Sequence, residues 1–203
     1  HVGNRVCHIT LLFEFGCWLT WAQENGIHPA VMAYGKYRPN NINNFNPDSR
    51  INATPRIWEK ISKILRISPK IEKHVEAVIA GFVGDGVAKE FIAFNQLVIE
   101  VDVDAIFKNP EKAPIPDKPD RKYAVCAAII ERVKDQKQVD AALQYASRLF
   151  DLPNASGAEF ATFLFHSLLV NKSKKDLVKM IVKSPAIDLI SKRKETIELF
   201  KGL

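Results

Sequence analysis

Apolar residues along this 203-residue chain recur every three or four positions, which is the spacing of one face of an α-helix. The clearest case is TPRIWEKISKIL, residues 54–65, where Thr54 is typical of an N-cap and Pro55 of a first helical residue. The buried stripe expected for this helix consists of Ile57, Ile61, Ile64 and Leu65.

Similar patterns predict helices over most of the remaining chain. The expected ranges are 17–25, 29–38, 70–82, 84–98, 119–134, 136–150, 158–171, 173–183 and 186–201, with a shorter segment at 102–107. Residues 4–15, NRVCHITLLFEF, mix β-branched and aromatic residues in a way that predicts one short strand. The expected fold class is therefore all-α, with at most one or two short strands near the N-terminus.

A proline-rich stretch, KNPEKAPIPDKPD at residues 108–120, interrupts the helical pattern. Four prolines in so short a window favour a semi-extended connector. We therefore expect one helical unit before it, a linker at 109–118, and a second helical unit at 119–203.

Charge is concentrated near the C-terminus. Residues 172–203 contain nine Lys/Arg and four Asp/Glu, so they carry five of the six net positive charges. Cys7, Cys17 and Cys126 match no zinc spacing and no disulfide framework, and we expect them to be buried thiols in a reducing compartment. No apolar run approaches the roughly 20 residues of a membrane span, and no signal peptide is evident. The expected location is the cytoplasm, without a membrane partner.

No segment of the sequence matches a complete catalytic motif. The spacing in GFVGDGVA resembles a phosphate-binding loop, but Val87 and Ala88 replace the lysine and the hydroxyl residue that the loop needs. Glu100, Asp102 and Asp104 alternate with apolar residues, and the five histidines are scattered. We therefore expect no catalysis by this chain alone, and no metal site.

Arg56 is unusual because a cation in the first turn of a helix lies at the positive end of the helix dipole. Two interpretations follow from the residues. The guanidinium either belongs to an anion site that lacks its anion, or is a solvated side chain whose stem covers apolar surface. Pro55 would make the first turn rigid, and Trp58 would pack beneath it.

Residues 1 to about 110 resemble the end of the MoxR-like AAA+ ATPases. The resemblance is carried in order by GNRVCHI, WLTWAQENGIHPAV, YRPNNINNFNPDS and TPRIWEKIS, the last matching a TPR-x-W motif. It implies that residues 1–15 are a remnant of the last core strand and that 16–108 form a helical lid-type bundle. Residues 119–203 would be a C-terminal helical extension, for which the match is less specific.

The resemblance also implies roles for individual residues. Arg56 would be the sensor-2 arginine that contacts the terminal phosphate of ATP, supported by Pro55 and Trp58. Arg5 falls where an arginine finger is often placed, although Val6 replaces the more usual phenylalanine. Mg²⁺ would be held by core residues that this sequence does not contain. The implied function is to couple the nucleotide state to remodelling of a protein client.

Partners would then be an ATPase core or neighbouring subunits of a homo-oligomeric ring. Two alternatives remain open on the residues. One is a non-enzymatic helical binding module whose basic C-terminal helices, at 172–203, dock on nucleic acid or an acidic protein. The other is a truncated relative that caps an ATPase ring.

Overall fold

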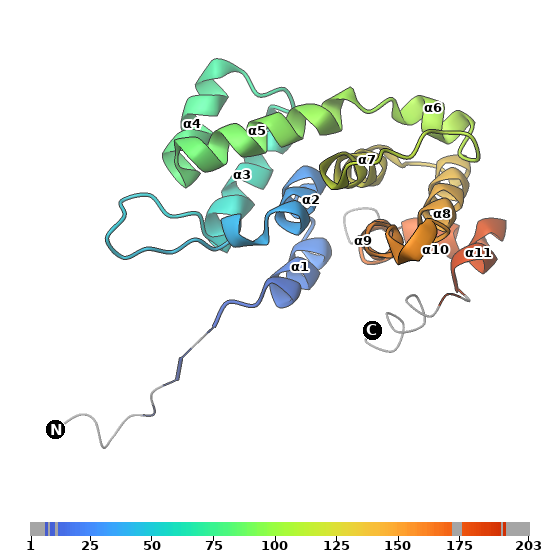
Figure 1. Ribbon diagram of the computed structural model, residues 1–203, viewed down its shortest axis with the longest axis horizontal. Helices are drawn as coiled ribbons and strands as arrows, with labels where there is room; N and C mark the ends of the chain where they lie inside the picture. The colour runs from blue at the N-terminus through green and yellow to red at the C-terminus, as the bar shows by residue number, and fades with distance from the viewer. Residues whose placement is uncertain (1–6, 8, 11, 172–175, 192, 194–203) are drawn as a thin grey trace.

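The computed structural model describes residues 7, 9–10, 12–171, 176–191 and 193. All regular secondary structure in this part of the chain is helical, as the sequence predicts (Figure 1). The first half contains α1 (Phe15–Glu24), α2 (Pro29–Tyr37), η2 (Pro39–Asn41), α3 (Pro55–Ile67), α4 (Lys73–Val83), α5 (Asp85–Glu100) and α6 (Val103–Lys108). The second half contains α7 (Pro119–Arg132), α8 (Gln136–Phe150), η3 (Pro153–Ala155), α9 (Ala158–Leu169), α10 (Leu177–Lys183), η4 (Pro185–Ile187) and α11 (Asp188–Ser191).

The predicted strand at 4–15 is wrong for the residues that can be described. Residues 7, 9–10 and 12–14 have no regular structure, and α1 already begins at Phe15. A strand requires a neighbour for its backbone hydrogen bonds. The described residues offer β-pairing only at a single bridge between Asn44 and Ala53, so the apolar pattern at the N-terminus has no partner strand.

Helix boundaries follow local signals. Glu14 caps α1, since its carboxylate accepts hydrogen bonds from the backbone N–H groups of Gly16 and Cys17. Gly26 follows the end of α1 with a φ of 66°, a left-handed conformation that glycine adopts without strain. The predicted helix at 186–201 is shorter among the described residues, where α11 ends at Ser191.

Helix α7 is the centre of the structure. Eight consecutive residues, 123–130, are buried, so this helix is covered on all sides rather than along one stripe. It packs against α2 and α5 from the first half and against α9 from the second (Figure 1). One hydrophobic core therefore continues across the proline-rich segment.

The proline-rich segment is held against α8. Arg148 donates hydrogen bonds to the carbonyl oxygens of Pro110 (2.6 Å) and Ala113 (2.7 Å), and the Tyr145 hydroxyl donates to that of Pro114 (3.0 Å). Besides two turn hydrogen bonds to the Asn109 carbonyl oxygen, the connector thus obtains partners for its backbone from the second half of the chain.

Candidate functional site

Arg56 lies in the first turn of α3 and is exposed. Thr54 is the N-cap and Pro55 the first helical residue, as predicted, but the Thr54 side chain makes no capping hydrogen bond. The first turn contains no acidic residue. Within the described part of the chain Arg56 has no hydrogen bond or ion pair. Its guanidinium is therefore available to an external anion.

Trp58, two residues further along, is fully buried. Its indole Nε1 donates a hydrogen bond of 2.9 Å to the carbonyl oxygen of Asn41 in η2. Its ring contacts those of Tyr34 and Phe91, with centroids 5.4 Å and 5.1 Å away. Since these rings belong to α2 and α5, Trp58 fixes the start of α3 against both helices.

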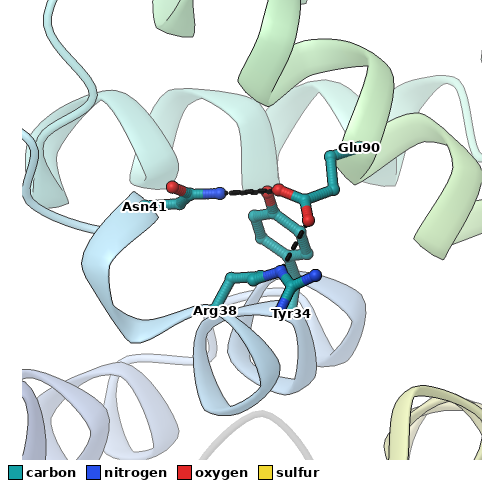
Figure 2. A network of polar contacts seen from close by, with 4 residues as sticks. All are labelled: Tyr34, Arg38, Asn41 and Glu90. Atoms are coloured by element: carbon teal, nitrogen blue, oxygen red, sulfur yellow. Dashed lines mark hydrogen bonds and ion pairs between the residues drawn. The ribbon is translucent and has the colours of Figure 1, made fainter.

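A polar network lies beside this anchor (Figure 2). The Glu90 carboxylate accepts hydrogen bonds from Tyr34 Oη (3.1 Å), Arg38 Nε (2.5 Å) and Asn41 Nδ2 (2.9 Å). Asn41 Nδ2 also donates to Tyr34 Oη at 2.7 Å. Asn41 thus belongs to the network through its side-chain amide, and its backbone carbonyl oxygen accepts the hydrogen bond from Trp58. The network therefore stabilises the turn that carries Arg56.

Electrostatics make this network a positioning device. Partial burial raises the pKa of Glu90, but the hydrogen bonds from Arg38, Tyr34 and Asn41 outweigh burial and leave it below its ordinary value. Burial raises the pKa of Tyr34, so its hydroxyl keeps its proton and remains a donor. Neither group is poised to exchange a proton near neutral pH.

Sequence reasoning missed most of this network. Tyr34 and Glu90 are 56 residues apart, and no short-range motif connects them. The sequence offers one weak signal for the network, which is the charged Glu90 directly before the aromatic Phe91 on α5. Phe91 is fully buried in the structure, so Glu90 lies at the border of the core.

The other predicted site residue, Arg5, lies outside the described residues. The expectation of three buried thiols was wrong for two of them, since Cys7 and Cys17 are exposed and only Cys126 is buried. Burial raises the pKa of the Cys126 thiol, which makes it unreactive. The described residues contain no cluster of three His, Cys, Asp or Glu side chains able to hold a metal ion.

The basic C-terminal segment is described only in part. Six of its nine Lys and Arg residues, at 172, 174, 175, 192, 194 and 201, lie outside the described residues. Of the others, Lys179 pairs with Asp176 at 3.5 Å and Arg193 with Asp151 at 2.6 Å. Docking of this segment on nucleic acid or an acidic protein stays a prediction.

A cavity of about 370 Å³ opens between α5, α6 and α7. Its wall is mainly apolar and includes Leu97, Ile106 and Val125, while Glu100 and Arg121 also line it. It adjoins neither Arg56 nor the Glu90 network, so it adds nothing to the candidate site. Across the residues that the structure describes, no helix has the length and apolar character needed to span a membrane.

Comparison with known proteins gives no relative: no protein family, no curated protein and no solved structure matches this chain.

Proposed function

We propose that this chain is the lid and C-terminal extension of a MoxR-like AAA+ ATPase, in which Arg56 senses bound ATP. The observation that carries the proposal is the exposed Arg56 guanidinium, which has no partner among the described residues. It lies on a helix start that the buried Trp58 fixes through its hydrogen bond to Asn41. The ATP and its Mg²⁺ would be bound by core residues outside this sequence.

The physical argument concerns charge and rigidity. An arginine presents a planar fork of N–H donors, which suits phosphate oxygens. The N-terminus of α3 adds the positive end of a helix dipole to that fork. A terminal phosphate would therefore favour lid orientations that bring Arg56 towards it, and its loss on hydrolysis would remove that preference.

The same reasoning assigns no hydrolysis to these 203 residues alone. They contain neither the lysine and hydroxyl of a phosphate-binding loop nor a magnesium-binding carboxylate beside one. The partners would be the ATPase core or neighbouring subunits of a homo-oligomeric ring, and the outcome of turnover would be remodelling of a protein client.

The test is ATP turnover by the assembly that combines this chain with the Walker A and Walker B motifs. Arg56→Ala is expected to lower turnover by roughly tenfold or more, as loss of a single donor to developing charge does elsewhere. Arg50→Ala is the matched control, because Arg50 is also exposed and lies in the loop before α3. Near-normal turnover of the Arg56 variant, or an equal loss in both variants, would refute the sensor role.

A further inference from the structure

A second cavity, of about 240 Å³, lies where the C-terminal end of α3 meets α5 and α7. Leu65, Val98 and Ile99 supply apolar wall, and five polar or charged side chains also line it. Arg66, on its edge, is ten residues beyond Arg56 on the same helix. At 1.5 Å per residue this places the cavity about 15 Å along the axis from the candidate phosphate contact, so the two sites are separate.

Asn95 is the most informative residue of this cavity. It is only 3% exposed, and its side-chain amide makes no hydrogen bond with any described residue. Among the described residues Trp18 Nε1 is the fully buried side-chain polar atom that lacks a partner, so the Asn95 amide atoms remain accessible from the cavity. Amides in folded proteins almost always have hydrogen-bond partners. An amide left in this condition on a cavity wall can pair with a molecule that enters the cavity.

Two arginines give the cavity its positive character. Arg132 donates to the carbonyl oxygens of Val101 (Nη1, 2.8 Å) and Ile99 (Nη2, 3.2 Å), and Arg66 donates to that of Gly26. Each guanidinium has five N–H groups, so donors remain on both after these bonds. The hydrogen bonds to backbone carbonyl oxygens hold the two side chains in place. Ligand binding therefore costs less side-chain entropy than it would with two mobile arginines.

His28 and Glu131 complete the polar part of the lining. His28 Nδ1 accepts a hydrogen bond from the backbone N–H of Ala30 at 3.2 Å, so a neutral ring carries its proton on Nε2. Nε2 lies 3.8 Å from a Glu131 carboxylate oxygen. With His28 neutral, two arginines and one glutamate leave the lining with one net positive charge.

We propose that this cavity binds a small organic anion, whose carboxylate meets Arg66, Arg132 and the Asn95 amide. Its apolar body then contacts the aliphatic wall. The size is suitable, since an apolar cavity of about 150 Å³ accommodates benzene, and the larger volume here leaves space for a carboxylate. The proposal does not depend on the role of Arg56.

The experiment is a ligand-observed NMR titration of the 203-residue chain with benzoate, and with benzamide as its neutral counterpart. Benzoate is expected to bind in the millimolar range, as a ligand of its size permits, and at least threefold more tightly than benzamide. Absence of benzoate binding at about 10 mM, or equal binding of the two molecules, overturns the proposal.

Variants locate the binding. Asn95→Leu replaces the amide by an apolar group of similar size, so benzoate affinity should fall about tenfold. Unchanged affinity overturns the proposal.

Arg66→Gln is a second variant in case Asn95→Leu does not fold, because Arg66 is exposed and its loss leaves the core intact. It should weaken benzoate binding at least threefold. Lys63→Gln, which removes an exposed cation of α3 that does not line the cavity, should leave binding unchanged. Equal effects of these two substitutions would assign the binding to general surface charge and overturn the proposal.

Discussion

The buried imidazole of His28 should make the stability of this protein depend on acidity. Burial lowers the pKa of His28 from 6.5 to about 4, and the nearby positive charge of Arg66 acts in the same direction, whereas Glu131 opposes both. Between these two pKa values the unfolded chain binds a proton at His28 and the folded chain does not. Unfolding then takes up a proton, so stability falls as pH falls from about 6.5 towards 4.

The magnitude follows from the two pKa values. Moving from about pH 7 to about pH 4.5 should lower the free energy of unfolding by about 2 kcal/mol through His28 alone. The loss would be nearly complete near pH 4, where the folded protein begins to bind the proton too. Burial also lowers the pKa of His166, which adds a change of the same sign to the wild-type protein.

A variant separates His28 from these other groups. His28→Asn keeps a residue that caps helices well, here at the start of α2, but removes the titrating ring. Urea unfolding followed by circular dichroism at both pH values gives the two free energies for each protein. The acid-induced loss should be about 2 kcal/mol smaller in His28→Asn than in wild type.

The same exchange at an exposed histidine, His74→Asn, controls for the substitution itself. If His28→Asn and wild type lose the same free energy between the two pH values, the imidazole does not titrate as its burial requires. A loss of cooperativity in urea would instead reveal an acid-induced intermediate, for which this two-state treatment does not hold.

Two matched pairs of substitutions test the packing. Trp58→Phe removes the indole donor from the carbonyl at the end of η2 and leaves a void, and should cost about 2–3 kcal/mol in urea unfolding; at the half-exposed Trp21 the same change should cost under about 1 kcal/mol. Gly157→Ala should destabilise by about 2–3 kcal/mol, since an added Cβ would lie 2.0 Å from the carbonyl oxygen of Leu149. Gly81→Ala, with nothing within 4 Å of the new methyl group, should stabilise α4 by about 0.5–1 kcal/mol; similar effects at the two glycines would contradict the packing described.

Much of the fold could be predicted from the sequence because helical signals are local. Thr54 and Pro55 mark the start of α3, and the stripe residues Ile61 and Leu65 are fully buried. The strand at the N-terminus failed for the opposite reason. Composition indicates that a segment could pair, but pairing depends on a partner elsewhere in the chain.

The candidate site was predictable only in part. Arg56 stands out locally, because its position in a first turn conflicts with the helix dipole. Asn95 and Glu90 gave no such signal. Each is a polar residue on an amphipathic helix, and its surroundings come from segments far away in the sequence.

One face of α3 connects this helix, which carries Arg56 in its first turn, to the segment that contains α2. Trp58, Ser62 and Arg66 are spaced by four residues and therefore lie along one side of the helix. Their hydrogen-bond partners all belong to the segment that contains α2: the Asn41 carbonyl, the His28 backbone N–H and the Gly26 carbonyl.

The start of α3 is hydrogen-bonded to Asn41, which follows the C-terminal end of α2. The later turns of α3 are hydrogen-bonded to Gly26 and His28, which precede the N-terminus of α2. The two helices therefore run in opposite directions and are joined by three hydrogen bonds. A displacement of the Arg56 turn must therefore carry α2 with it or break the hydrogen bond from Trp58 to the Asn41 carbonyl oxygen. Helix α2 in turn packs on the central helix α7. Under the proposed function, a phosphate contact at Arg56 would therefore act on a helix that is connected through α2 to the central helix α7.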